Sequence, residues 1–149
     1  METALFLFYL VAFCIAVVYI PFFKNSGIRP PFLIALFLIK IAAGFAYAKF
    51  FKLPQYYPGA DTWRFYRQSL IETEWLLQKP SFFFKDLFTH GYGSAGNLFS
   101  GENSYWNDLK SNMLVKLIAI TNVLTNSNYY AAIIFFNFLF LFGLVALTR

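Results

Sequence analysis

Long apolar runs separated by short polar stretches dominate the hydrophobic pattern of this chain. The three longest runs cover residues 3–23, 32–51 and 129–147, and the first and third of them contain no charged residue. A helix needs about 20 apolar residues to cross the hydrocarbon core of a bilayer, which is about 30 Å thick. The pattern therefore predicts an all-α membrane protein with three transmembrane helices.

The second and third apolar runs are separated by a long and more polar loop, residues 52–112. Apolar residues recur at helical spacing within it and predict an amphipathic helix over about 62–78 that lies at the membrane surface. The apolar face of that helix is expected to hold Trp63, Tyr66, Leu70 and Leu77. The polar face is expected to hold Arg64, Arg67, Glu72 and Glu74. After Pro80 the loop becomes rich in aromatic residues and glycine, which is typical of irregular structure packed at an interface.

A fourth apolar run, residues 113–125, lies directly before the third long run. It is too short to cross a bilayer, so its length predicts an interfacial or re-entrant helix. The polar stretch "TNSNYY" separates it from the run at 129–147. The chain between the second and third long runs is thus predicted to contain two interfacial helices.

The distribution of positive charge predicts how the chain is oriented in the membrane. Lys24 and Arg29 lie in the short connection 24–31, and cytoplasmic loops are enriched in lysine and arginine. This connection and the C-terminus, with Arg149, are therefore expected on the cytoplasmic side. The N-terminus and residues 52–112 are then expected outside the cell.

The composition excludes some classes of function. Charged residues make up 13% of the chain, against about 25% in soluble domains, and hydrophobic residues make up 59%. The net charge of +5 lies near the predicted membrane ends and forms no basic stripe, so nucleic-acid binding is not expected. The single cysteine, Cys14, cannot form an internal disulfide, and we interpret it as a packing or lipid-facing thiol.

Asp61 is the first candidate for chemistry. It follows Pro58 and Gly59 at the start of the predicted surface helix, where a carboxylate can act as the N-cap. A carboxylate held at a helix start is also preorganised to contact a metal ion or to accept a proton from a hydroxyl group. The sequence leaves both roles open.

Three cations are candidates for binding a phosphate. Arg64 and Arg67 follow Asp61, and a guanidinium group matches the oxygen geometry of phosphate; the alternative is that they pair with Glu72 and Glu74. Lys40 lies in the middle of the run 32–51, where a charge is costly unless it has a partner. It is expected to contact an anionic headgroup, phosphate or carboxylate, unless the helix register places it nearer the interface.

Two stretches resemble the C-type membrane glycosyltransferases, which are polytopic enzymes that use lipid-linked sugar donors. "PGADTWRFY" is similar to the Gly-Asp-x-x-x-Tyr region of that family. The stretch from "NMLVKLIAITNVLT" to the C-terminus is similar to its short apolar helix, polar turn and spanning helix. The resemblance implies that Asp61 is the catalytic base or a contact of a divalent cation, Mg²⁺, Mn²⁺ or Ca²⁺. Because such enzymes have more than three spans, the chain is expected to be the N-terminal fragment of a longer protein, inactive alone.

The resemblance implies part of a glycosyltransferase or polysaccharide-assembly enzyme of the bacterial inner membrane. The sugar would come from a polyprenyl-phosphate-linked donor in the membrane lipid, with Arg64, Arg67 and Lys40 near its phosphate. The alternative hypothesis is a small noncatalytic membrane subunit, or scaffold, whose aromatic outer loop docks a membrane protein partner.

Overall fold

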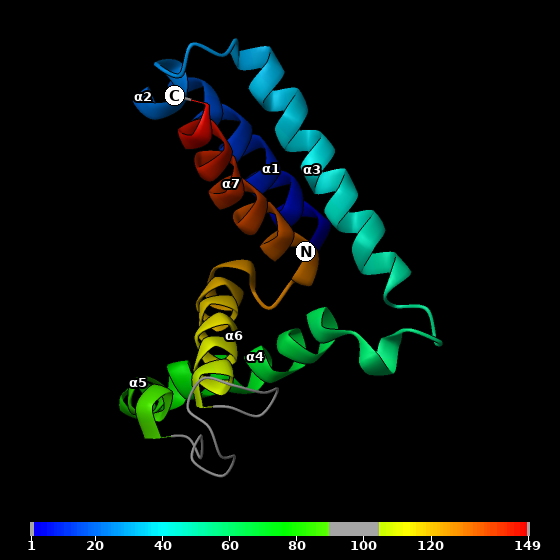
Figure 1. Ribbon diagram of the computed structural model, residues 1–149, viewed down its shortest axis with the longest axis vertical. Coiled ribbons are helices and arrows are strands. Elements are labelled where there is room, and N and C mark those ends of the chain that lie inside the picture. Colours follow the sequence, from blue (N-terminus) through cyan, green and yellow to red (C-terminus); the bar gives the residue numbers. More distant parts are fainter. Residues whose placement is uncertain (1, 90–104, 149) are drawn as a thin grey trace. The chain divides into compact units, whose positions relative to one another are not determined.

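The computed structural model describes residues 2–89 and 105–148 of the chain (Figure 1). The described residues form helices joined by turns and contain no strand, which confirms the all-α prediction for this part of the chain. The fold divides into two compact units. The terminal unit comprises residues 1–56 and 128–149, and the central unit comprises residues 57–127.

The terminal unit holds the apolar helices. Its elements are α1 (Glu2–Tyr19), α2 (Pro21–Lys24), α3 (Pro30–Phe50) and α7 (Tyr129–Leu147). Helices α3 and α7 are long and apolar enough to cross a membrane, whereas the apolar helix Thr3–Tyr19 within α1 is shorter. The structure thus contains two or three candidate membrane-spanning helices.

A proline divides the first predicted span. The run 3–23 was expected as one helix, but α1 ends at Tyr19 and α2 begins at Pro21. Ile20 between them is extended, with φ −64° and ψ 123°. A residue before proline is pushed out of the helical region by a clash with the proline ring, which explains the break.

Aromatic side chains form much of the core of the terminal unit, where α7 packs against α1 and α3 (Figure 1). Phe138 of α7 lies at the centre of this packing. Its ring centroid is 4.4 Å from that of Phe13 in α1, 5.7 Å from that of Phe23 in α2 and 6.0 Å from that of Phe37 in α3. The Phe138 ring of α7 therefore packs against aromatic side chains of three other helices.

Helices α3 and α7 approach closely at Gly44. A Cβ atom added there would lie 2.9 Å from Ile133 Cγ2 and 3.4 Å from Asn137 Nδ2. The first distance is shorter than a van der Waals contact, so a side chain at position 44 would require Ile133 to shift. Small residues at helix crossings let backbones approach closely in membrane proteins.

We expect Gly44→Ala to weaken the packing of α3 against α7 by about 1–3 kcal/mol, as overpacking of a tight contact does. Thermal unfolding of the protein in detergent measures this loss. The matched control is Gly143→Ala in α7, because a Cβ there meets nothing within 4 Å. Equal stability of the two variants would show that the Gly44 contact is not needed.

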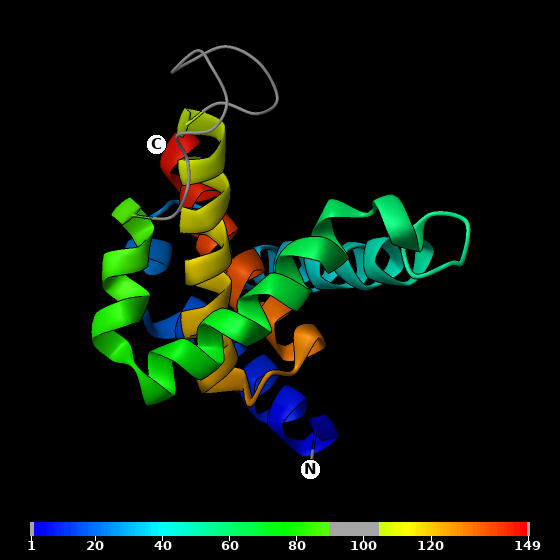
Figure 2. The ribbon, with the colours of Figure 1, turned by 90° about the horizontal axis from the view of Figure 1, so that it is seen from below.

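The central unit comprises η1 (Tyr57–Gly59), α4 (Asp61–Gln78), α5 (Pro80–Thr89) and α6 (Tyr105–Thr125). Helix α6 packs against α4, and α5 contacts both (Figure 2). Helix α4 agrees with the amphipathic helix predicted over 62–78. Helix α6 includes the predicted run 113–125 but begins eight residues earlier, since no glycine or proline interrupts residues 105–125.

Candidate functional site

The buried face of α4 differs from the predicted one. Trp63 is buried as part of the packed unit, but Leu70 and Leu77, expected on the same face, are exposed. Glu72, expected on the polar outer face, is buried. The predicted division of α4 was therefore wrong for these three residues, because α4 packs partly through polar side chains. The other charged residues of the predicted polar face, Arg64, Arg67 and Glu74, are exposed as expected.

A buried ionic cluster joins the three helices of the central unit. Lys116 Nζ of α6 lies 2.7 Å from Glu72 Oε2 of α4 and 3.5 Å from Asp86 Oδ2 of α5. It also lies 4.3 Å from the centroid of the Phe83 ring. The exposed fractions of the three charged residues are only 5% for Lys116, 7% for Glu72 and 5% for Asp86. The ammonium group thus compensates carboxylates that would be very costly to bury alone.

A hydrogen-bonded network continues the polar interface between α4 and α6. Asn122 Nδ2 donates to Ser69 Oγ at 2.9 Å and to Thr73 Oγ1 at 3.2 Å. Both hydroxyl groups donate in turn to backbone carbonyl oxygens of α4. Tyr66 donates its hydroxyl to the carbonyl oxygen of Ser127, after the end of α6. These contacts fix α6 on α4 through directional bonds.

Sequence reasoning missed this cluster. The available signal was a lysine and an asparagine, Lys116 and Asn122, within an otherwise apolar run, because polar groups there usually face a partner. The partners themselves are 44 and 30 residues away from Lys116 in the chain. Helical spacing carries no information about such distant pairs.

The structure places Asp61 at the start of α4 but not as its cap. The N-cap is Ala60, without a side-chain cap bond, and Asp61 is the first helical residue. The N-cap prediction was therefore wrong. Asp61 Oδ1 lies 3.0 Å from Arg64 Nη2, and the two side chains are 69% and 55% exposed. A carboxylate at this end of a helix is favoured by the helix dipole, and its exposure leaves it accessible to a ligand.

Arg67 lies one helical turn beyond Arg64. Its guanidinium carbon is 5.0 Å from the ring centroid of Tyr57, and its side chain is exposed. The alternative pairing of Arg64 and Arg67 with Glu72 and Glu74 is not observed. Glu72 pairs with Lys116, and Glu74 accepts a hydrogen bond from Gln78 at 3.0 Å. In the described part of the chain Arg67 has no carboxylate partner, so its guanidinium group is available to bind an anionic ligand.

Lys40 belongs to a different unit from Asp61, Arg64 and Arg67. It lies on α3 of the terminal unit, half-buried, with its Nζ 5.6 Å from the ring centroid of Phe140 on α7. This cation–π contact partly compensates the cost of placing the Lys40 charge among apolar helices. The structure thus gathers three of the four predicted site residues on α4 and leaves Lys40 in the terminal unit.

The α4 start can bind an anion and accept a proton. Two guanidinium groups offer donors to phosphate oxygens, and one carboxylate offers an acceptor beside them. Among residues 2–89 and 105–148, no three His, Cys, Asp or Glu side chains are grouped to hold a metal ion. Asp61 is the carboxylate that this group of residues offers to a cation.

The aromatic stretch after Pro80 was expected to be irregular, but Pro80–Thr89 forms helix α5, so the expectation is wrong for these residues. Residues 90–104 of the same stretch lie outside the described residues. No family model, no curated protein and no solved structure matches this chain, so its own residues carry the functional argument.

Proposed function

We propose that the chain forms part of a bacterial inner-membrane glycosyltransferase or polysaccharide-assembly enzyme. Its donor would be a sugar linked to a polyprenyl phosphate. The observation that carries the proposal is the exposed Asp61 with Arg64 and Arg67 on two turns of one helix. Only residues 51–60 separate this group from the end of α3, a candidate span. The short connection keeps the group near the membrane, where a lipid-linked donor presents its phosphate.

Different residues would bind the donor phosphate and accept the proton. Arg67 would hold the donor phosphate first, since Arg64 already contacts Asp61. Asp61 would accept the proton of the acceptor hydroxyl while that oxygen forms its bond to the anomeric carbon of the sugar. The bond from that carbon to the phosphate oxygen breaks, and the lipid phosphate leaves with the bonding electrons. Lys40 would contact an anionic headgroup or phosphate from its position in α3.

A divalent cation fits this proposal in a limited way. Mg²⁺ is often held by one or two carboxylates together with phosphate oxygens of the substrate and water. As the alternative to acting as the base, Asp61 would be the contact of this cation in the chain, and the ion would neutralise charge on the leaving phosphate.

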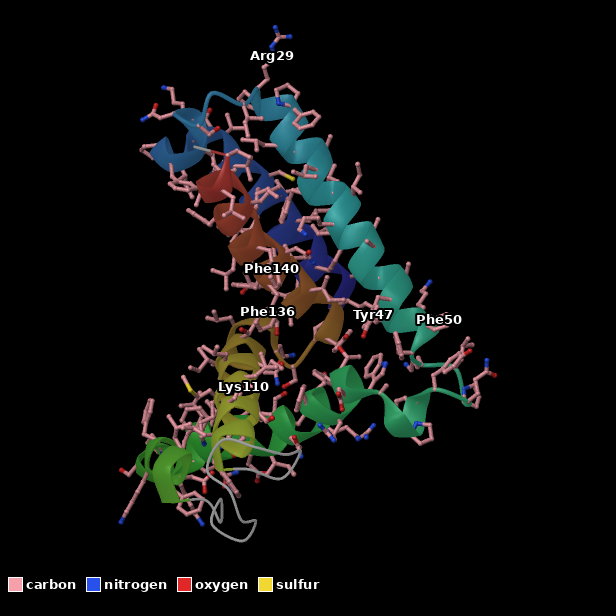
Figure 3. The ribbon with its side chains drawn as sticks, in the orientation of Figure 1. Arg29, Tyr47, Phe50, Lys110, Phe136 and Phe140 are labelled. Atoms are coloured by element: carbon pink, nitrogen blue, oxygen red, sulfur yellow. The ribbon has the colours of Figure 1, made fainter. Side chains whose placement is uncertain are left out.

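The proposal includes an orientation. Residues 52–112 and the N-terminus would lie outside, and residues 24–31 and the C-terminus would lie in the cytoplasm. Lys24 and the exposed Arg29 at the α2–α3 connection support this orientation through the positive-inside rule (Figure 3).

We expect Arg67→Gln to weaken binding of a polyprenyl phosphate to the protein in lipid vesicles about tenfold, because a charge-assisted hydrogen bond to phosphate is lost. Equilibrium binding to the reconstituted protein measures the change. Gln68→Ala is the matched control, since Gln68 is the exposed neighbour and carries no charge. Equal binding by both variants would remove the phosphate site and favour the noncatalytic subunit instead.

A further inference from the structure

The outward face of α6 is apolar over three turns, apart from the half-buried Thr121, whose hydroxyl donates to the carbonyl oxygen of Leu117. Every exposed residue between positions 113 and 124 belongs to this face, with exposed fractions from 40% to 56%. The face is defined by Met113, Leu114, Leu117, Ile120, Val123 and Leu124. A helix that carried this face in water would be costly, because soluble proteins rarely expose apolar patches of this kind.

Three polar residues of the same helix point inward. Lys116 is buried in the ionic cluster, Asn122 bonds to Ser69 and Thr73, and Thr125 is fully buried. Along α6, buried polar groups therefore lie opposite an exposed apolar face, which is unusual for a soluble domain. Polar side chains that face the bundle interior are characteristic of helices surrounded by hydrocarbon.

The chain ties one end of α6 to the membrane. Helix α6 ends at Thr125, and the candidate span α7 begins at Tyr129 after a turn of three residues. Asn126 and Ser127 adopt left-handed backbone conformations, with φ 51° and 55°, and terminate α6 abruptly. The C-terminal end of α6 must therefore lie at the level where α7 enters the bilayer.

Both ends of α6 are expected at headgroup level, because α7 enters the bilayer directly after its C-terminal end and Lys110 precedes its apolar face. The face, residues 113–124, then extends about 17 Å along the membrane surface, at about 1.5 Å per residue. A helix in this position buries its apolar side at the boundary between headgroups and acyl chains. Lys110, one turn before the face begins, is exposed and charged, as expected of a residue at headgroup level (Figure 3).

We propose that the outward face of α6 lies against lipid acyl chains of one leaflet, with the Lys116 cluster turned away from them. The occupant is lipid because the exposed residues of α6 have the same apolar character as those of the candidate spans. Leu38 and Ile39 of α3 and Leu139 and Phe140 of α7 are exposed in the same way. This inference does not depend on the proposed sugar transfer.

Spin labels on single cysteines test the proposal in the full chain reconstituted into phosphatidylethanolamine–phosphatidylglycerol vesicles. The sites are Leu117→Cys, Ile120→Cys and Leu124→Cys, each in a Cys14→Ala background. Collisions with oxygen, which concentrates in lipid, are compared with collisions with a water-soluble nickel complex. We expect oxygen collisions to exceed nickel collisions severalfold at all three sites.

Two control positions come from the same helix. Lys110→Cys is expected to show the reverse ratio, and Ala119→Cys, at a fully buried position, is expected to show few collisions of either kind. Dominant nickel collisions at positions 117, 120 and 124 would place the face in water and overturn the proposal. Few collisions with both reagents there would show that protein covers the face, which would overturn it equally.

Discussion

Replacing Lys116 with methionine is expected to destabilise the protein by about 3–5 kcal/mol, the range seen when one partner of a buried ion pair is removed. Methionine fills a similar volume but has no charge. The carboxylates of Glu72 and Asp86 then lose the ammonium group that lies 2.7 Å and 3.5 Å from them. Because the three residues come from three helices, the loss is expected to loosen the whole central unit. Denaturant-induced unfolding in detergent measures the free energy.

The chain offers close controls for this substitution. Lys110→Met changes an exposed lysine of the same helix and is expected to alter the free energy of unfolding by less than about 0.5 kcal/mol. Lys116→Arg keeps the positive charge and is expected to be milder than Lys116→Met. If Lys116→Met is as mild as Lys110→Met, the cluster does not stabilise the fold.

The sequence predicted the apolar helices well because their signal is local. Residues 32–51 and 129–147 correspond to α3, Pro30–Phe50, and α7, Tyr129–Leu147. The prediction of one helix over residues 3–23 was wrong, because Pro21 breaks a helix that the apolar pattern alone would continue. Hydrophobicity reports where a segment can be buried, and it does not report backbone breaks.

The packing of the central unit could not be predicted in the same way. The helical spacing of apolar residues predicted a helix over 62–78. It did not predict which face of that helix would be buried. That side depends on α6, whose Lys116 and Asn122 select Glu72 and Ser69 of α4 as partners. A polar interface between distant segments leaves no hydrophobic periodicity in either of them.

The candidate site was partly accessible from sequence. Asp61 and Arg64 are three residues apart, so any helix through them brings their side chains close, and the structure places them 3.0 Å apart. The capping role failed because the helix begins one residue earlier than a cap at Asp61 would require, with Ala60 as its N-cap. In this position the carboxylate makes no cap bond and is 69% exposed.

Asp61→Asn in the intact protein is expected to reduce sugar transfer at least about 100-fold, the lower range for loss of a general base. The amide keeps the size of the side chain but neither accepts a proton readily nor carries the charge that holds a cation. The fold is expected to persist, because Asp61 is exposed and makes no cap bond. Its exposed pair with Arg64 contributes little stability.

The control for this substitution is Glu74→Gln, which removes an exposed carboxylate from the same helix without touching the proposed site. It is expected to leave transfer unchanged.

The most direct measurement is therefore the rate of sugar transfer from a polyprenyl-phosphate-linked donor by membranes containing wild-type, Asp61→Asn or Glu74→Gln protein at matched levels. Loss of transfer in Asp61→Asn alone is the predicted result. Wild-type transfer by Asp61→Asn would contradict the assignment of Asp61 to the reaction.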